Sequence, residues 1–249
     1  MSERERERWA GEGFAGGTLY DAARPSYPDA AVARVVADLE LDRSSRVVDL
    51  GAGTGIFTRL LAPLVGEVVA IEPSASMRTA LVEASPGITV LDGRDDAIPL
   101  ADGWADAVVV AQAFHWFDAS RALAEIARVL RPGGGLGLVW NERDESWVWV
   151  RRLTRAMRWD ENRPFDGHAD WAGIVARGPF RRVTRHDLPW LESVSPAVLQ
   201  RRVATTSYVT LLEEAERAAL LADVAEVLTD QPDPLALPYR SIVVTARRA

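Results

Sequence analysis

The sequence predicts an α/β fold, a Rossmann-like, doubly wound sheet that is mostly parallel, with an antiparallel last strand and additional helical cap elements. Three observations predict it. Short apolar runs alternate with segments of helical spacing, a glycine-rich loop follows the first of these runs, and another apolar run closes the chain. Strands that alternate with helices of about ten or more residues form right-handed βαβ units, so the sheet they build is parallel.

The expected elements follow in chain order. Apolar runs predict strands over residues 46–50, 67–71, 88–91, 106–112, 136–141, 181–190 and 239–246. Helical spacing predicts helices over residues 55–64, 74–84, 118–130, 196–204 and 212–229. Ser74 and Asp118 are candidate N-caps, and the Arg-Pro-Gly-Gly-Gly run at 131–135 is expected to stop the helix before it.

Composition narrows the class of protein. Of the 249 residues, 48% are apolar, which suffices for a sizeable core. The formal charge of −7 argues against binding a polyanion by bulk electrostatics, so we expect no nucleic-acid partner. No cysteine is present to form a disulfide or a thiolate site. No apolar run approaches the roughly 20 residues that cross a bilayer, so we expect a cytoplasmic protein with no membrane partner.

The loop after the first strand contains Gly51, Gly53 and Gly55. Glycine permits positive φ and adds no side chain, so the backbone can pass close to a ligand at the carboxyl ends of the strands. The loop does not fit a dinucleotide fingerprint, because Ile56 stands at the last glycine position of G-x-G-x-x-G. A phosphate-binding P-loop is also excluded, since no Gly-Lys-Ser/Thr follows.

Two acids favour a different ligand. Asp49 stands two residues before the first glycine, where a carboxylate would repel pyrophosphate but can attract an ammonium group. Glu72 closes the second strand, where an acid can accept hydrogen bonds from ribose hydroxyls. Read by itself, Glu72 is equally an ordinary strand-end carboxylate.

Segment 49–55 resembles motif I of class I S-adenosylmethionine-dependent methyltransferases, and Glu72 resembles their ribose-binding acid. Segments 20–28, 111–118 and 140–141 resemble a subgroup of small-molecule methyltransferases that includes trans-aconitate methyltransferase-like proteins. The resemblance covers most of the chain and is strongest over 18–145. It implies that S-adenosylmethionine is the cofactor, with S-adenosylhomocysteine as product.

The resemblance also implies a division of the chain. We expect a single methyltransferase domain over residues 1–249. Within it, 1–17 would be a flexible tail, 18–145 the cofactor-binding core, 146–235 cap helices and a late strand, and 236–249 the final strand.

The expected cofactor contacts come from five segments. They are Tyr20, Arg24, Asp49, Gly51, Ala52, Gly53, Gly55, Glu72, Pro73, Asp95, Asp96 and Gln112. Similar enzymes frame adenine with a Gly-(Asp/Thr)-Ala-Glu turn; here the turn departs from that pattern, and Asp95 is the favoured adenine contact. Arg24 would pair with the methionine carboxylate, with Tyr20 hydrogen-bonding near it; the alternative is an arginine that anchors the N-terminal arm. Gln112 would lie under the methionine portion or simply end a strand.

The acceptor site is expected after the fourth and fifth strands. His115 is the candidate catalytic base or acceptor contact, and the alternative is that residues 114–117 form an aromatic wedge that packs the next helix. The other expected acceptor contacts are Trp116, Trp140, Asn141 and Arg143. His168 and His186 have no metal-ligand spacing, so no metal is expected.

These features lead to a leading hypothesis and several alternatives. The leading one is methyl transfer from S-adenosylmethionine to a small molecule, as O-methylation of a carboxylate or a hydroxyl. A catalytically silent S-adenosylmethionine-binding protein that acts through partners and a protein methyltransferase are the alternatives. An NAD-dependent oxidoreductase is a rival at the level of the fold, which Ile56 and Asp49 oppose.

Overall fold

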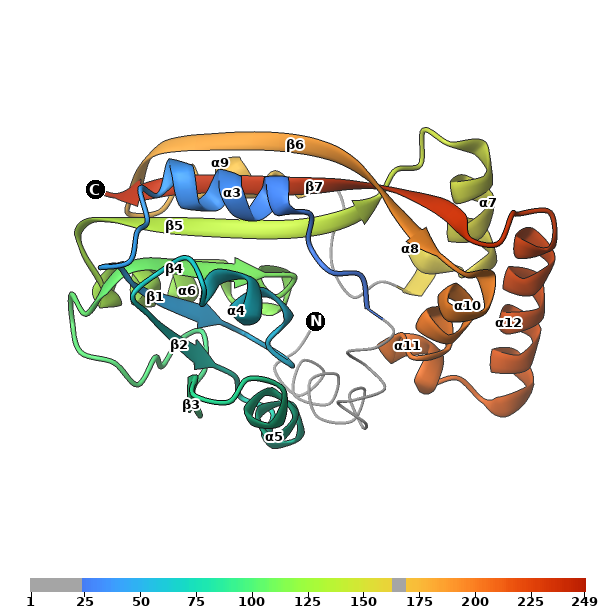
Figure 1. Ribbon diagram of the computed structural model, residues 1–249, viewed down its shortest axis with the longest axis horizontal. Coiled ribbons are helices and arrows are strands. Elements are labelled where there is room, and N and C mark those ends of the chain that lie inside the picture. Colours follow the sequence, from blue (N-terminus) through green and yellow to red (C-terminus); the bar gives the residue numbers. More distant parts are fainter. Residues whose placement is uncertain (1–23, 163–168) are drawn as a thin grey trace. The chain divides into compact units, whose positions relative to one another are not determined.

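The structure of the protein is a computed structural model that describes residues 24–162 and 169–249 (Figure 1). Tyr20, His168 and the expected tail at 1–17 lie outside the described residues. The chain divides into two compact units. Of the described residues, the sheet unit comprises 26–141, 169–188 and 241–249, and the helical unit comprises 24–25, 142–162 and 189–240. The expectation that residues 1–249 form a single domain stays a prediction.

A seven-stranded sheet in the order β3-β2-β1-β4-β5-β7-β6 organises the sheet unit. Its strands are β1 (Arg46–Leu50), β2 (Glu67–Ile71), β3 (Thr89–Leu91), β4 (Ala105–Ala111), β5 (Leu130–Arg143), β6 (Phe180–Val194) and β7 (Leu235–Arg248). The pairs from β3 through β5 are parallel and the last strands are antiparallel, so the predicted fold class is confirmed. The chain order reverses between β1 and β4, which is where ligands bind in doubly wound sheets.

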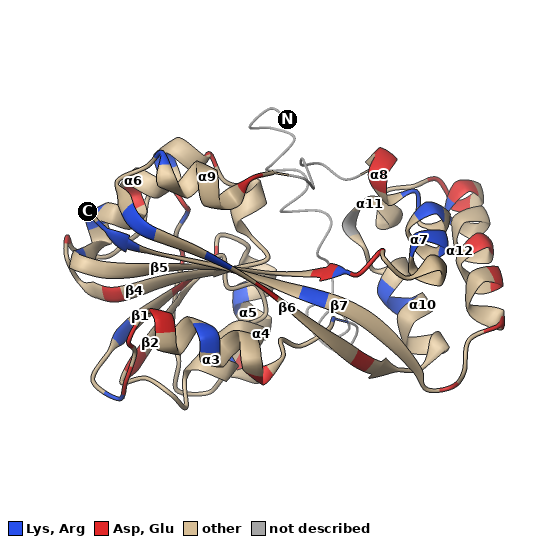
Figure 2. Cartoon of the chain, turned by 90° about the horizontal axis from the view of Figure 1, so that it is seen from above, with Lys and Arg blue, Asp and Glu red and all other residues tan. Residues whose placement is uncertain are grey.

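Helices cover both faces of this sheet, which is why its central strands read as continuous apolar runs. Apolar side chains of α3 (Asp29–Asp38) and α4 (Ile56–Leu61) pack on one face. Those of α6 (Ala119–Val129) and α9 (Trp171–Ala176) pack on the other, and Figure 2 shows these two helices on the opposite side from α3 and α4. Helix α5 (Ala75–Ala84) follows β2. Asp118 is confirmed as the N-cap of α6, because its side chain accepts the backbone N–H groups of Ser120 and Arg121.

The helical unit contains α7 (Val148–Ala156), α8 (Trp159–Asn162), α10 (Pro196–Ala204), α11 (Ser207–Thr210) and α12 (Glu214–Thr229). The chain passes between the two units within β5, β6 and β7. Buried side chains of α7, α10, α11 and α12 form its core with residues from the ends of β6 and β7. In the part of the chain that the structure describes, no helix has the length and apolarity needed to cross a membrane.

The last three strands are longer than the sequence predicts, at 14, 15 and 14 residues. Strand β6 lies at the edge of the sheet, and most of its residues are exposed or half-buried. Its ends therefore lack the apolar run by which a strand is recognised in the sequence. Residues 131–135 end helix α6 as predicted but lie inside β5 rather than in a loop. Ala105 and Ala107 pair with Leu130 and Gly135, so the residues between the latter two bulge out of the ladder.

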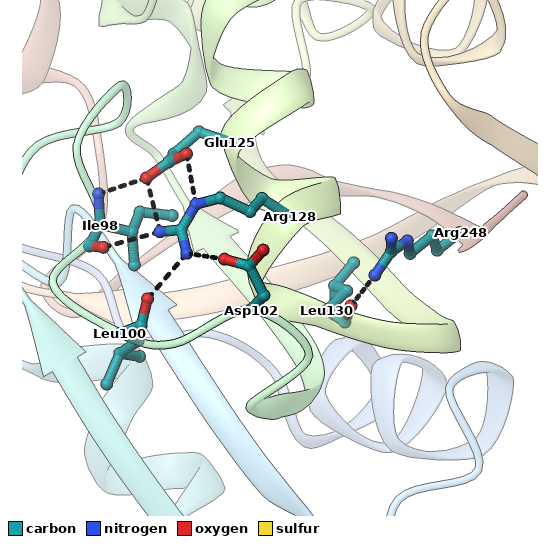
Figure 3. Close-up of polar contacts among 7 residues, drawn as sticks. All are labelled: Ile98, Leu100, Asp102, Glu125, Arg128, Leu130 and Arg248. Carbon is teal, nitrogen blue, oxygen red and sulfur yellow. Dashed lines mark hydrogen bonds and ion pairs between the residues drawn. The ribbon is translucent and has the colours of Figure 1, made fainter.

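A charged cluster ties the segment after β3 to helix α6 (Figure 3). Arg128 donates to the carbonyl oxygens of Ile98 and Leu100, at 2.9 Å each, and pairs with Asp102 and Glu125. Glu125 in turn accepts the backbone N–H of Ile98 at 2.8 Å. These charge-assisted bonds hold the segment that follows the expected adenine turn.

Candidate active site

The glycine loop is held at the carboxyl ends of β1 and β2. Leu50 and Ile71 are paired at the ends of these strands, and the backbone N–H groups of Gly51 and Ala52 both donate to the Ile71 carbonyl, at 2.8 and 3.1 Å. The parallel register therefore brings Asp49, the loop and Glu72 to the same edge of the sheet, as the sequence predicts.

The three glycines of the loop serve different purposes, although each has positive φ. A Cβ at Gly51 would lie 2.7 Å from the Ala113 Cβ, and one at Gly55 would lie 2.9 Å from the Leu81 Cγ, so both positions are closed by packing. At Gly53, where φ is +56°, no heavy atom of the described residues lies within 4 Å of a built Cβ. Gly53 is therefore the place where a ligand can approach the backbone.

Asp49 is fully buried, with one carboxylate oxygen satisfied and one not. Thr58 donates its hydroxyl to Asp49 Oδ2 at 2.5 Å, whereas Oδ1 is buried without a hydrogen-bond partner among the described residues. Burial raises the pKa of Asp49 to about 6; the Thr58 hydrogen bond opposes this shift, and the nearby charge of Glu72 adds to it. An unsatisfied buried carboxylate oxygen is costly, and a ligand cation is the partner that would relieve it.

Glu72 joins the end of β2 to the glycine loop. Its Oε2 accepts the Gly53 N–H at 2.9 Å, and its Oε1 accepts the Ser74 N–H at 2.8 Å. Burial raises the pKa of Glu72, while these two hydrogen bonds lower it. Because each carboxylate oxygen accepts two hydrogen bonds, both oxygens retain capacity for hydroxyl donors. The next residue, Pro73, is exposed, and its carbonyl accepts from Arg78 at 2.8 Å.

These residues fit the cofactor that the resemblance implies. Asp49 Oδ1 has the charge and the vacant lone pairs for an α-ammonium group, Glu72 has the capacity for two ribose hydroxyls, and Gly53 leaves room between them. Pyrophosphate fits poorly beside the buried Asp49 carboxylate, which would repel it. Thr58, which orients Asp49, was not among the expected site residues. No motif marks a residue nine positions after Asp49 as its hydrogen-bond partner.

The turn after β3 is a compact hairpin in which Arg94 and Ala97 exchange backbone hydrogen bonds of 3.3 and 3.1 Å. Asp95 is half-buried, and burial raises its pKa, with the neighbouring Asp96 adding to the effect. Asp96 is engaged with Arg121 on α6 at 2.8 Å. The adenine contacts expected of Asp95 and Asp96 stay predictions. Asp96 would have to contact adenine while it remains paired with Arg121.

Gln112 and His115 follow β4. Gln112 is exposed, has a φ of +54°, and donates its side-chain amide to the Asn141 carbonyl at 3.0 Å. A left-handed glutamine is uncommon and tends to occur at functional sites. His115 is half-buried; Trp140 Nε1 donates to its Nδ1 at 3.4 Å, and burial lowers the pKa of His115 to about 3. The imidazole is therefore neutral at pH 7, with its proton on Nε2.

The expected acceptor contacts are partly structural. Trp140 is buried and stacks on Trp171, with ring centroids 5.1 Å apart. Asn141 is also buried; it donates to the Ser26 carbonyl at 3.1 Å and accepts from Ser241 at 2.6 Å. Trp116 is half-buried, and its ring centroid lies 5.1 Å from that of His115.

The aromatic wedge that the sequence offered as an alternative for residues 114–117 also forms in part. Phe114 is buried and packs edge-on against Phe117 and Trp171. A role for the neighbouring His115 in acceptor binding stays a prediction.

Arg24 and Arg143 belong to the helical unit. Arg24 donates to the Thr205 carbonyl at 3.3 Å, which is compatible with the anchoring role that the sequence left open. The Arg143 guanidinium lies 5.5 Å from the ring centroid of Trp159. The proposed ligand contacts of both arginines stay predictions.

Comparison with known proteins defines the class. Residues 48–138 match the family model described as a methyltransferase domain. An uncharacterized methyltransferase of Mycobacterium tuberculosis is 40% identical over 236 residues, covering 92% of this chain and 93% of that protein. The malonyl-[acyl-carrier protein] O-methyltransferase of Methylococcus capsulatus is 33% identical over 150 residues, covering 55% of this chain and 52% of that enzyme.

The fold is shared with solved structures at lower identity. A candidate type II methyltransferase of Anaeromyxobacter dehalogenans superposes with a TM-score of 0.68 at 22% identity, covering 90% of this chain and 97% of that one. The protein is thus a Rossmann-like S-adenosylmethionine-dependent methyltransferase. The chain belongs to the methyltransferase family that includes the mycobacterial protein.

Proposed function

We propose that the acceptor is a small organic acid and that the reaction is O-methylation of its carboxylate, as in the trans-aconitate methyltransferase-like subgroup. The observation that carries this proposal is that His115 Nδ1 already accepts the Trp140 Nε1–H at 3.4 Å, while burial lowers the pKa of His115 to about 3. Such a weak base deprotonates a phenol or an alcohol inefficiently near neutral pH. A carboxylate is already ionised and needs no base, so the low basicity costs such an enzyme nothing.

The residues of the sheet unit would act mainly by positioning. S-adenosylmethionine supplies an activated methyl group on its sulfonium. Asp49 would hold the ammonium group, Glu72 the ribose and Gln112 the methionine portion, which fixes the direction of the methyl group. Holding the reactants in line can by itself account for most of the acceleration of such a displacement. His115, with its proton on Nε2, would donate a hydrogen bond to an acceptor oxygen rather than take a proton from it.

Two further observations support this acceptor class. The Methylococcus capsulatus relative is an O-methyltransferase that acts on a malonyl group, and a malonyl group ends in a carboxylate. The formal charge of −7 disfavours a nucleic-acid acceptor. O-methylation of a hydroxyl is the second candidate, and the experiment separates the two.

The test is a screen of small carboxylic acids, phenols and alcohols with methyl-labelled S-adenosylmethionine, followed by the H115Q variant. Glutamine keeps a hydrogen-bonding side chain beside Trp140 but has no basic nitrogen. For a carboxylate acceptor we expect kcat/KM to fall less than about tenfold, with no change in the shape of its pH profile between pH 6 and 9. W116F is the matched control for disturbance of the aromatic neighbours.

Methylation of phenols or alcohols but not acids, with a loss of about 100-fold or more in H115Q, would overturn the carboxylate proposal. Binding of S-adenosylmethionine without transfer to any acceptor would instead favour the catalytically silent alternative.

A further inference from the structure

Four buried side-chain polar atoms of the helical unit, from Arg24, Arg143, Thr154 and Trp190, make no hydrogen bond among the described residues, and two of them are donors that lie near each other. They are Nε of Arg143, at the end of β5, and Nε1 of Trp190, on β6. Neither atom has a partner among the described residues. Leaving a donor buried and unsatisfied costs about 1–3 kcal/mol, and more when the donor is charged, so two such groups in one small unit call for an explanation.

The two donors lie around one residue, Tyr239 on β7. Strand β7 runs between β5 and β6, and the Asp144 N–H donates to the Pro238 carbonyl at 2.9 Å, which sets Arg143 beside Tyr239. On the other side, the Trp190 ring stacks on Tyr239, with centroids 5.0 Å apart. Burial raises the pKa of Tyr239, and the charges of Arg202 and Arg143 oppose that rise.

Two further aromatic rings lie near Arg143. Arg143 lies over Trp159, whose ring centroid is 5.8 Å from that of Tyr208. Tyr208 is buried and donates its hydroxyl to the Met157 carbonyl at 2.5 Å. Burial raises the pKa of Tyr208 to about 12, against the opposing charge of Arg143. Rings of this kind favour the flat or apolar body of a small organic molecule.

The other buried arginine of this unit is already neutralised. Arg202 makes two hydrogen bonds to the Glu192 carboxylate, at 2.6 and 2.7 Å, and donates to the Tyr239 hydroxyl at 3.0 Å. Arg143 differs, because no carboxylate of residues 24–162 or 169–249 forms an ion pair with it. Within the described residues, the Arg143 guanidinium therefore makes no ion pair, and the Trp190 N–H makes no hydrogen bond.

We propose that Arg143 and Trp190 form a binding site for an organic acid, in which Arg143 pairs with a carboxylate and Trp190 donates to a second oxygen of the same molecule. A guanidinium matches the planar geometry of a carboxylate, and an indole N–H donates without adding charge. The two donors favour acids that carry at least one further oxygen acceptor, such as dicarboxylates or hydroxy acids.

The test is calorimetric titration of the full chain, without S-adenosylmethionine, with benzoate, cinnamate, succinate, malate and citrate. The neutral amides of these acids and inorganic phosphate are the comparison ligands. We expect at least one acid with a second oxygen acceptor to bind, and R143Q to weaken it by about tenfold or more. W190F removes the N–H but keeps an aromatic ring, and we expect it to weaken the same acid severalfold while leaving benzoate unaffected.

The controls are R152Q, an exposed arginine on α7, and W149F, a partly buried tryptophan packed on the same core. Both should bind the acids as the unaltered chain does. R143K keeps the charge if R143Q fails to fold, and it should bind more weakly because lysine lacks the planar fork.

No binding of any acid, equal binding by R143Q, or equal affinity for the neutral amides would overturn the site. Preference for phosphate would also overturn it, in favour of a phosphoryl ligand.

Discussion

Among single residues, Asp49 is the one whose buried carboxylate links stability to ligand binding. A carboxylate that is fully buried, bonded to one hydroxyl and otherwise unsatisfied costs the folded state free energy, as its raised pKa records. A bound cation would offset the free-energy cost of burying this carboxylate. Asp49 borders the loop whose Gly53 N–H donates to Glu72. Local instability and ligand affinity therefore have the same origin.

We expect D49N to stabilise the ligand-free protein by about 3 kcal/mol at pH 7, because it removes a buried charge and keeps an oxygen for Thr58. The pKa of Asp49 is raised from 3.8 to about 6, so the penalty is complete above pH 6 and disappears as the pH falls toward 4. Urea unfolding at pH 7 and pH 4 measures this; an equal gain at both would contradict the assigned cause. D29N, at an exposed position, is the control.

The same D49N variant should bind S-adenosylmethionine at least about tenfold more weakly, since a neutral amide cannot pair with an ammonium group. For the unaltered chain we expect the affinity to fall as the pH drops below about 6, because the ionised carboxylate is the binding form. Calorimetry between pH 5 and 8 measures both effects. Undiminished binding by D49N would remove Asp49 from the cofactor site.

At the scale of elements, the loop between β1 and α4 divides its work among glycines that look alike in sequence. Gly51 and Gly55 let the loop pack against Ala113 and Leu81, whereas no atom of the described residues lies within 4 Å of a Cβ built at Gly53. The sequence analysis treated all three as ligand-binding, because spacing shows where glycine is needed and not what occupies the space beside it.

We expect G53A to cost about 1 kcal/mol of stability, for its left-handed φ, yet to weaken S-adenosylmethionine binding tenfold or more, because the added methyl group fills the ligand's approach. For G55A we expect the larger loss of stability, about 2–4 kcal/mol, because the added Cβ would lie against the fully buried side chain of Leu81. Its effect on S-adenosylmethionine binding should be the smaller one. Calorimetric melting and titration of both variants check this. Equal losses of affinity and stability in the two would refute the division.

At the scale of the whole molecule, the family defines the reaction, while each compact unit carries its own polar site. Asp49, Glu72 and the glycine loop lie in the sheet unit, and Arg143, Trp190 and Tyr239 lie in the helical unit.

We expect S-adenosylmethionine and S-adenosylhomocysteine, at about 100 times their Kd, to raise the melting temperature by about 5–10 °C, because a ligand that binds only the folded state stabilises it by mass action. NAD and NADH at the same concentrations should produce no shift, since the Asp49 carboxylate would repel pyrophosphate and Ile56 replaces the last glycine of the dinucleotide fingerprint. Thermal-shift measurements decide this, and a shift with NAD alone would refute the cofactor assignment.

Much of the fold was predictable because local pattern carries it. The apolar runs of β1, β2 and β4 are continuous because helices bury both faces of the sheet. The prediction was weaker for β6, an edge strand with little apolar pattern, and for α7, α8 and α9, which the sequence analysis did not resolve into separate helices.

The sequence by itself determined the fold class, the glycine loop and its two acids, because hydrophobic period, turn residues and spacing along β1 and β2 are local properties of the chain. Only the packing of distant segments shows that Asp49 Oδ1 has no hydrogen-bond partner among the described residues, that burial lowers the pKa of His115, and that Arg143 and Trp190 share a neighbour in Tyr239. Burial and hydrogen-bond partners depend on segments far apart in the chain, and these alone set the charge and basicity of each group.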